Sequence, residues 1–298
     1  MVSQKFTPTI LVTGSNGQLG NEIKVLSKFF PSYNFLFVSR EELSIENSES
    51  LQSFFEKNKI DYCINCAAYT AVDKAESETE KAFLINADAA GKLATICLEH
   101  QTKLIHISTD YVYDGSVHIP LKEENAVGPV NVYGSSKLKG EELALDNNPS
   151  ALIIRTSWVY SSFGNNFVKT MLRLFREKEE INVINDQLGS PTYAADLASV
   201  IMEFIEKTQQ GETFSGIVNY SNAGTTNWYE FAQEIKSLVN SNCKINPIPT
   251  SSYPTPAKRP LYSVLDTSKI KEILHLEISS WKESLKKCLE TLIPGSVL

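Results

Sequence analysis

Near its start the chain has a short apolar run, three evenly spaced glycines and then a helical pattern, and this succession limits the possible folds more than any other feature. Thr9–Thr13 is apolar and β-branched, and Gly14, Gly17 and Gly20 follow at intervals of three. From residue 21 to residue 30 apolar side chains recur at helical spacing. A strand that turns tightly into a helix is the first unit of a doubly wound α/β fold.

The rest of the first half repeats this alternation of strand and helix. Further strands are expected at residues 34–38, 60–65, 103–107 and 151–156, with helices at 48–58, about 78–100 and 132–145. The strands are apolar on both faces, which is typical of a parallel sheet covered by helices on both sides. Right-handed crossovers then give a doubly wound, Rossmann-like sheet.

The glycine-rich turn also predicts a site for a dinucleotide. Its spacing differs from the commonest G-x-G-x-x-G fingerprint, but the physics is the same. Glycines let backbone N–H groups approach a pyrophosphate, and the helix N-terminus adds partial positive charge. The alternative is a tight turn that only packs the helix on the sheet. The residues expected to bind the cofactor here are Gly14, Asn16, Gly17, Gln18, Leu19 and Gly20.

Beyond about residue 158 the alternation loosens, and we expect a smaller α/β substrate-binding domain there. Helices are expected at 167–176, 196–207, 228–240 and 279–292, and a strand at 217–220. Residues 247–260 contain several prolines, so this segment should be extended or looped. We assign residues 1–160 to a dinucleotide-binding domain, with segments at about 192–222 returning to it, and 161–298 to the interleaved second domain.

The end of the second expected strand bears on which dinucleotide binds. An acidic residue there would hold the ribose 2′-hydroxyl of NAD, whereas this chain has Ser39 and Arg40. Arg40 could pair with the 2′-phosphate of NADP, or it could be a solvated charge. We therefore expect NADPH, with NADH as the open alternative.

A Y-x-x-x-K pattern, formed by Tyr133 and Lys137, lies in the expected helix 132–145. Positions i and i+4 share a helix face, so both side chains can reach one site. A nearby ammonium favours the phenolate, which makes the tyrosine a usable acid or base near neutral pH. The pattern alone could equally be an ordinary helix pair.

The end of the fourth strand gives that pattern a context, because doubly wound folds place their sites at the carboxyl ends of strands. This strand ends in Ser108 and Thr109. Neighbouring residues point to opposite faces, so one of the two hydroxyls should point inward. Thr109 is the candidate for orienting a substrate carbonyl oxygen, and Ser108 is its competitor.

Taken together, these motifs resemble those of the dTDP-4-dehydrorhamnose reductases, a family within the extended short-chain dehydrogenase/reductase superfamily. The matching segments are the glycine-rich turn and residues 67–76, 108–113, 131–137, 155–160, 164–167, 186–192 and 253–260. The resemblance spans nearly the whole chain, and most of these segments are more specific than the superfamily-wide turn and Y-x-x-x-K.

The resemblance implies hydride transfer from NADPH or NADH to C4 of dTDP-4-dehydro-L-rhamnose, giving dTDP-L-rhamnose for cell-surface polysaccharide. It implies that Thr109 polarises the ketone, that Tyr133 donates the proton, and that Lys137 holds the tyrosine and the cofactor ribose. It assigns Ala67, Ala68, Tyr69 and Thr70 to the cofactor, and Asp110, Trp158 and Arg259 to the substrate.

Each of the three substrate assignments has an alternative. Trp158 could be core packing, Asp110 could cap the following turn, and Arg259 could be a surface charge. The chain also departs from the family pattern, because some relatives have Asp where this chain has Ser39, and Cys66 often corresponds to alanine.

Other functions stay open. A reductase of another sugar nucleotide, or a 4-epimerase, would share these residues. A dehydratase is disfavoured, because Tyr111 stands where such enzymes usually carry glutamate. From a different class, a non-catalytic NADP-binding regulatory subunit would keep the fold without the reaction.

Composition narrows the expected partners. The net charge of −7 argues against a nucleic-acid partner, and no apolar run approaches the ~20 residues that span a bilayer. We expect a cytoplasmic protein, a monomer or a homodimer, with no membrane partner. The five cysteines should be reduced thiols, with Cys63 and Cys66 at the end of a buried strand. No cluster of side chains calls for a metal.

Overall fold

A parallel sheet of six strands forms the centre of the computed structural model, which describes residues 7–293. Its strands are β1 (Thr9–Thr13), β2 (Asn34–Val38), β3 (Tyr62–Asn65), β4 (Lys103–Thr109), β5 (Leu152–Thr156) and β10 (Gly216–Tyr220). They lie in the order β10-β5-β4-β3-β1-β2, and every neighbouring pair is parallel. The order reverses between β1 and β3, which is where doubly wound sheets bind their ligands. The predicted fold class is confirmed.

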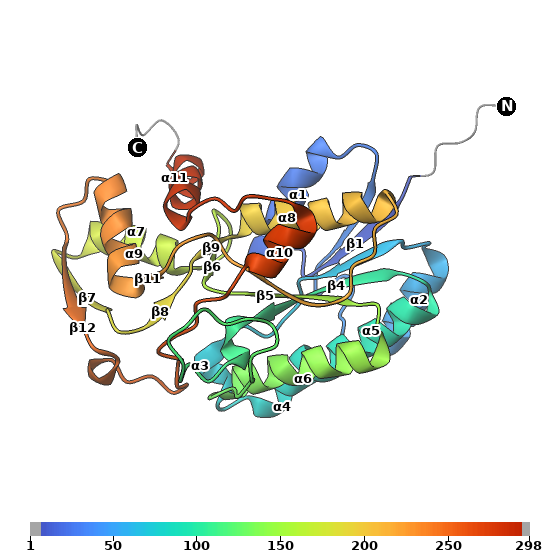
Figure 1. Ribbon diagram of the computed structural model, residues 1–298, viewed down its shortest axis with the longest axis horizontal. Coiled ribbons are helices and arrows are strands. Elements are labelled where there is room, and N and C mark those ends of the chain that lie inside the picture. Colours follow the sequence, from blue (N-terminus) through green and yellow to red (C-terminus); the bar gives the residue numbers. More distant parts are fainter. Residues whose placement is uncertain (1–6, 294–298) are drawn as a thin grey trace.

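Helices cover both faces of this sheet, because each strand is apolar on both sides (Figure 1). Ile10 and Val12 of β1 pack towards α1 (Gln18–Leu26), α8 (Ala194–Gln209) and α10 (Ser268–Leu274). Leu11, between them, packs towards α2 (Ser48–Lys57), α5 (Ala89–Glu99) and α6 (Val132–Asn147). The alternation of side chains along a strand therefore supplies one half of each of two cores.

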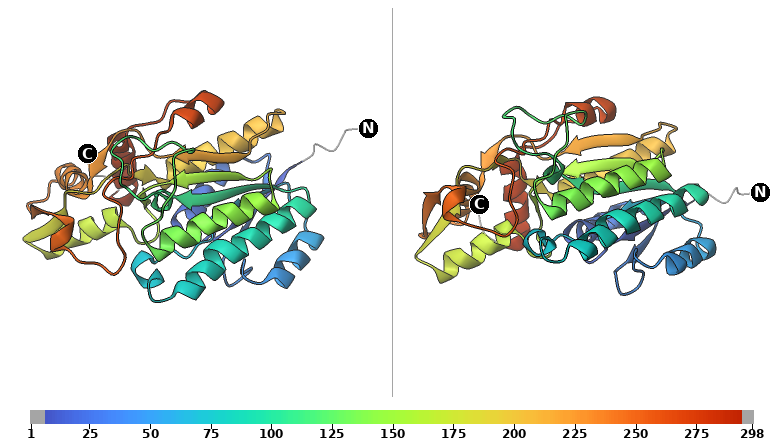
Figure 2. Two further views of the ribbon diagram at one scale, coloured as in Figure 1. Left: turned by 60° about the horizontal axis from the view of Figure 1, so that its bottom comes forward. Right: turned by 90° about the horizontal axis from the view of Figure 1, so that it is seen from below.

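A smaller lobe continues from the carboxyl ends of the strands (Figures 1 and 2). It contains α7 (Phe167–Glu177), α9 (Trp228–Leu238), α11 (Trp281–Leu292) and the parallel pair β7 (Glu180–Ile184) and β12 (Lys244–Ile248). Four two-residue strands connect it to the sheet: β6 (Val159–Tyr160), β8 (Leu188–Gly189), β9 (Thr192–Tyr193) and β11 (Thr226–Asn227). Its core is aromatic, with Phe231 in contact with Tyr160, Phe167 and Trp281.

The chain returns from this lobe to the main sheet. After β9, α8 packs beside α1, and β10 then pairs with β5. The assignment of residues 1–160 and 161–298 to two domains remains a prediction, and this return is the observation that supports interleaving.

The helix expected at about 78–100 is interrupted. It consists of α4 (Thr79–Phe83), a π-helical segment at Leu84–Asp88, and α5. Asn86 in the π segment accepts from the backbone N–H of Tyr69 at 2.8 Å and donates to the Tyr69 carbonyl at 3.0 Å. Gly140 of α6 lies against the Asn86 carbonyl, where a side chain would collide with it. A helical periodicity cannot reveal such a bulge, because one inserted residue hardly changes the apolar pattern.

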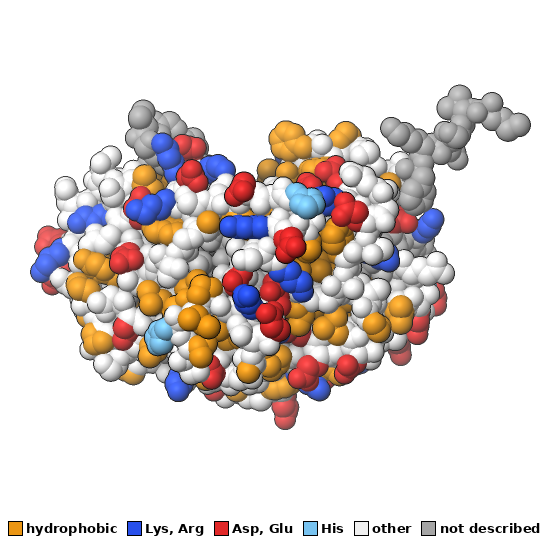
Figure 3. Space-filling model, in the orientation of Figure 1, with side chains coloured by type: hydrophobic (Ala, Val, Ile, Leu, Met, Phe, Trp, Pro, Cys, Tyr) orange, Lys and Arg blue, Asp and Glu red, His pale blue; other side chains and the backbone are white. Residues whose placement is uncertain are grey.

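The surface gives no sign of a bilayer-spanning element. Within residues 7–293 no helix has both the length and the apolar character needed to cross a membrane. On the face shown in Figure 3, acidic and basic side chains lie intermingled.

A buried ion pair ties α6 to the centre of the sheet. Arg155 of β5 and Glu141 of α6 are 3% and 2% exposed, and Arg155 donates to both carboxylate oxygens, at 2.6 Å to Oε2 from Nη2. Arg155 also donates to the Tyr113 hydroxyl at 2.7 Å. Ser108 donates to Glu141 at 2.5 Å. Removing one partner would leave the other charge buried and unpaired.

Arg155→Met should therefore destabilise the protein by about 3–5 kcal/mol, which is roughly 6–15 °C in Tm. The matched control is Arg173→Met, because Arg173 forms an ion pair with Glu177 on the surface of α7. That variant should change stability by at most about 0.5 kcal/mol. Thermal unfolding of both variants measures the difference, and equal losses would contradict the role given to the buried pair.

Candidate active site

Residues from four segments meet at the carboxyl edge of the sheet. The turn after β1 contributes Gly14, the end of β3 leads to Ala67, β4 ends at Thr109, and α6 begins beside them with Tyr133. Asn131 caps α6 by accepting from the backbone N–H of Gly134 at 2.7 Å, which fixes the start of the helix just before Tyr133.

The glycine-rich turn has the shape that a diphosphate needs. Gly14 has φ +64°, and a Cβ on it would lie 2.7 Å from the backbone nitrogen of Ala67. Gly20 packs equally closely on the backbone of the same turn. Helix α1 starts at Gly17 without a side-chain cap, so its first N–H groups are left to an acceptor from outside the helix.

The other residues of the turn differ in what they can contribute. Asn16 and Gly17 are exposed, whereas the Leu19 side chain is buried in the core, so only its backbone can face a ligand. Gln18 joins the turn to the small lobe, because its Oε1 accepts from Asn166 Nδ2 at 2.9 Å. This bridge positions the first turn of α1 against α7.

Ser39 and Arg40 follow β2, as expected for residues near the adenosine ribose. The backbone N–H of Ser39 donates to Glu42 at 2.8 Å. The Arg40 side chain is 59% exposed and pairs with Glu46 at 2.8 Å. An exposed ion pair of this kind contributes little, so the guanidinium is available to a stronger anion such as a phosphate.

The Asn86 side chain holds the segment after β3 in place through two hydrogen bonds to the backbone of Tyr69. Ala67 and Ala68 are half-buried and Thr70 is exposed. Tyr69 turns its ring into the core, and its hydroxyl donates to Glu78 at 3.1 Å. Tyr69 can therefore face a cofactor only through its backbone. Asn86 was not identified in the sequence; the signal was an amide inside an otherwise apolar helical pattern.

Thr109 and Tyr133 lie close together, and Lys137 follows Tyr133 by one turn of α6. Burial raises the pKa of Tyr133 to about 12, which outweighs the lowering of that pKa by the nearby Thr109 hydroxyl. Lys137 is 1% exposed, and burial lowers its pKa to about 8. The competing hydroxyl of Ser108 is committed to Glu141. The geometry therefore favours Thr109 over Ser108 as the group beside the tyrosine.

Asp110 is a buried carboxyl group next to this cluster. It is 2% exposed and its Oδ1 accepts from the Thr109 hydroxyl at 3.0 Å. Burial raises the pKa of Asp110 to about 6, although Ser263 and other nearby donors partly offset this. Oδ2 makes no hydrogen bond of good geometry with the described part of the chain. A buried oxygen of this kind suits a ligand hydroxyl.

Trp158 is held in a strained backbone conformation at the junction of sheet and lobe. Its φ is +47°, which is rare for a bulky residue. Its indole stacks on Trp228 at 3.6 Å between ring centres and lies directly on Gly189, where a Cβ would be 2.5 Å away. Strain of this kind is concentrated at binding sites, so the position suits a substrate contact as well as packing.

Arg259 is paired rather than free. It donates to Asp73 at 2.9 and 3.0 Å, and to Thr255 at 2.7 Å. Tyr111 is close enough to raise its pKa. Arg259 therefore lies near the site as a bridge between the proline-rich segment and the loop after β3. Asp73 was not singled out in the sequence, since residues 186 positions apart show no local pattern.

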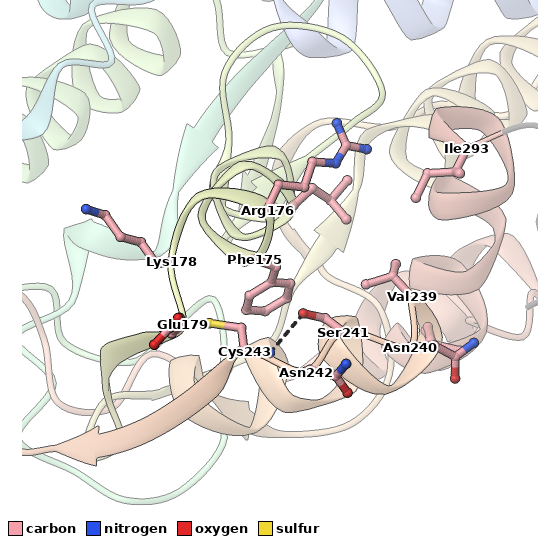
Figure 4. Close-up of a pocket in the computed structure, with 12 residues that line it drawn as sticks. Phe175, Arg176, Lys178, Glu179, Val239, Asn240, Ser241, Asn242, Cys243 and Ile293 are labelled. Carbon is pink, nitrogen blue, oxygen red and sulfur yellow. Dashed lines mark hydrogen bonds between the residues drawn. The ribbon is translucent and has the colours of Figure 1, made fainter.

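An open hollow of about 780 Å³ lies elsewhere, between α7 and the end of α9 (Figure 4). Phe175, Arg176, Glu179, Val239 and Cys243 line it. None of the expected site residues does, so the hollow is separate from the cluster at the sheet edge.

Comparisons with known proteins agree with this geometry. The family described as RmlD substrate binding domain matches residues 8–293. The dTDP-4-dehydrorhamnose reductase of Aggregatibacter actinomycetemcomitans is 39% identical over 284 residues, covering 93% of this chain and 97% of that protein.

Solved structures agree as well. A dTDP-4-dehydrorhamnose reductase from Clostridium acetobutylicum has a TM-score of 0.90 and 39% identity, covering 95% of this chain and 99% of that one. The reductase of Bacillus anthracis, solved in complex with NADP, has a TM-score of 0.91 and 36% identity, covering 96% and 100%.

Asp110→Asn should stabilise the protein at pH 8 but not at pH 4. The pKa of Asp110 is about 6 in the folded protein, against 3.8 for the free side chain. Its ionisation therefore favours unfolding, and this penalty appears as the pH rises through that window. Two pKa units correspond to at most roughly 3 kcal/mol. The Tm difference between variant and wild type, followed from pH 4 to 8, measures the effect.

The control for this titration is Asp114→Asn. Hydrogen bonds from Ser116 lower the pKa of Asp114, so the substitution should destabilise the protein at pH 8 and lose its effect as the pH falls. A Tm difference for Asp110→Asn that is independent of pH would contradict the assignment.

Proposed function

This chain belongs to the dTDP-4-dehydrorhamnose reductase family, and we propose that Thr109, Tyr133 and Lys137 carry out the family's reaction at the carboxyl edge of its sheet. The reaction is the NADPH-dependent reduction of the C4 keto group of dTDP-4-dehydro-L-rhamnose to dTDP-L-rhamnose, a step in the biosynthesis of activated sugars. The observation that carries the residue assignment is the closeness of the Thr109 hydroxyl to the Tyr133 phenol, one helical turn before the buried side chain of Lys137.

The residues around the turn after β1 fit NADPH, which supplies the hydride when bound. The uncapped start of α1 offers backbone donors for the diphosphate. Arg40 could exchange its exposed ion pair with Glu46 for one with the 2′-phosphate, and Ser39 precedes it in the chain. Lys137 would hold the nicotinamide ribose, and the backbone of residues 67–70 would line the cofactor between the ribose and the turn.

Tyr133 is the proton donor to the substrate oxygen. Because its pKa is raised to about 12, the phenol keeps its proton at neutral pH, which is the state that a donor requires. The Thr109 hydroxyl, which donates to Asp110 in the structure, would turn to donate to the same substrate oxygen and so orient the ketone. Lys137, when charged, stabilises the phenolate that remains after proton transfer.

Three further residues recognise the sugar nucleotide. The Asp110 oxygen that lacks a partner accepts a hydrogen bond from a sugar hydroxyl. Trp158 offers the sugar an apolar surface. Arg259 turns from Asp73 to the diphosphate of the substrate. It would thereby exchange an ion pair with a carboxylate for one with a more highly charged diphosphate.

Several expectations stay predictions. A cytoplasmic location, the monomeric or dimeric state, the absence of a nucleic-acid partner and the division into two domains are among them. Among the alternative functions, a 4-epimerase would leave no net change in NADPH, and a regulatory subunit would bind NADPH without turnover.

The test is the absorbance of NADPH at 340 nm in the presence of enzymatically generated dTDP-4-dehydro-L-rhamnose. The proposal predicts a substrate-dependent loss of absorbance with dTDP-L-rhamnose as product. Protein that binds NADPH but shows no loss would support the regulatory subunit instead.

Tyr133→Phe should fold normally and lose at least about a hundredfold in kcat, the usual scale for general acid catalysis. The phenylalanine keeps the ring, so NADPH binding should change little. Tyr111→Phe is the control, because Tyr111 packs edge-to-face on Tyr133 but is not assigned a proton transfer. Near-normal turnover of Tyr133→Phe would overturn the assignment.

Arg40→Ala should weaken NADPH binding about tenfold or more and leave NADH binding within about twofold. The reason is that only NADPH carries the 2′-phosphate, and a charge-assisted hydrogen bond contributes roughly 1.5–3 kcal/mol. Fluorescence titration with both cofactors measures the two dissociation constants. Arg173→Ala, which removes an equally exposed arginine on α7, is the control. Equal losses for NADPH and NADH would place Arg40 outside the phosphate site.

A further inference from the structure

A line of buried polar side chains crosses the sheet and ends on Lys137. Thr13 at the end of β1, Asn65 at the end of β3 and His106 in β4 are each at most 1% exposed, as is Lys137 itself. Thr13 Oγ1 donates to Asn65 Oδ1 at 2.7 Å, and Asn65 Nδ2 lies 2.9 Å from His106 Nδ1. His106 Nε2 lies 3.3 Å from Lys137 Nζ. The reaction as described so far uses only the last member of this line.

One backbone group fixes the direction of these hydrogen bonds. The N–H of Ala67 can only donate, and it reaches Asn65 Oδ1 at 3.2 Å. The other atom of the amide, Nδ2, must therefore be the one that faces His106, and it can only donate. His106 Nδ1 is consequently an acceptor.

The proton of His106 then lies on Nε2. Burial, with a smaller contribution from Lys137, holds the pKa of His106 well below its usual range, so the imidazole is neutral. A neutral imidazole carries one proton, and when Nδ1 accepts, that proton is on Nε2. The group that His106 presents to Lys137 is thus an N–H donor.

A donor facing a lysine favours the amine over the ammonium. The amine nitrogen has a lone pair that can accept this N–H, whereas the ammonium can only donate. The Nζ atom of Lys137 donates one hydrogen bond, to the Ile107 carbonyl at 2.6 Å. The other groups that face it, Cys66 from the end of β3 and Glu141 from α6, favour the charged form. Besides burial, which has the largest effect, His106 is therefore the side chain whose hydrogen bond opposes the charge.

We propose that His106 is a positioning residue for Lys137, whose Nε2–H fixes the place of the amine and favours its neutral form. This inference rests on the proposed function, because it concerns the residue that holds the cofactor ribose and stabilises the phenolate of Tyr133. A lysine in water keeps its charge to a pH of about 10.4. Burial lowers the pKa of Lys137 to about 8, and the Nε2–H of His106 favours the amine further. The charge of Lys137 therefore changes within reach of physiological pH, and the alkaline limb of activity reports that change.

Two substitutions of His106 separate its bond to Asn65 from its contact with Lys137. The amide of asparagine occupies the place of Nδ1, so His106→Asn keeps the bond to Asn65 and removes the group that faces Lys137. The longer glutamine reaches the place of Nε2, so His106→Gln keeps a contact with Lys137 but offers it an acceptor. The control is Thr102→Val, which removes a buried hydroxyl bonded to the Ile60 carbonyl at the opposite end of β4.

The first readout is the titration of the Lys137 amine by NMR in lysine-labelled protein without cofactor, with Lys137→Arg identifying its signal. The wild type should titrate near pH 8, and both His106 variants should titrate higher by about one pH unit or more. Thr102→Val should titrate as the wild type does. An unchanged midpoint in both His106 variants would overturn the proposal.

The second readout is the pH profile of kcat/KM with NADPH. In both variants the alkaline limb should move to higher pH by the same amount as the Lys137 midpoint. The KM for NADPH should rise several-fold in His106→Asn alone. Loss of Tm without movement of the limb or of KM would reduce His106 to a structural role. The cofactor-free titration does not depend on turnover, so it stands even if the wild type proves not to reduce the sugar.

Discussion

The close approach between the turn after β1 and the end of β3 determines most of the site. A side chain on Gly14 would lie 2.7 Å from the nitrogen of Ala67, so only glycine allows the two segments to meet. The same approach brings the Ala67 N–H to Asn65 and orients the amide that faces His106. One constraint therefore shapes the phosphate turn and, through the side chains of Asn65 and His106, the surroundings of Lys137.

The parts of this arrangement that are local in the chain could be predicted from the sequence. Strands β1 and β2 agree with their expected bounds, because each is an apolar run between turn residues. Tyr133 and Lys137 are one helical turn apart on α6, so their shared face follows from spacing alone. The carboxyl edge of the sheet, where the site was expected, is also where the hydroxyl of Thr109 lies near the phenol of Tyr133.

The parts that depend on contacts across the sheet could not be predicted in the same way. His106 reads as one residue of an apolar strand, and its partners Asn65 and Lys137 are 41 and 31 positions away. Strands of two residues, such as β8 and β11, are too short to show a period. A signal was nonetheless present, since adjacent strands carry Thr13, Asn65 and His106 in otherwise apolar runs. Buried polar groups need partners, so such coincidences point to a network.

These features describe a site in which the protein supplies a proton and orients the ketone, while the cofactor supplies the hydride. The measurement that tests this most directly is NMR analysis of the product formed from dTDP-4-dehydro-L-rhamnose and NADPH that carries deuterium at the transferred position. The account predicts dTDP-L-rhamnose with deuterium at C4 of the sugar. Product without deuterium, or with deuterium at another carbon, would contradict it.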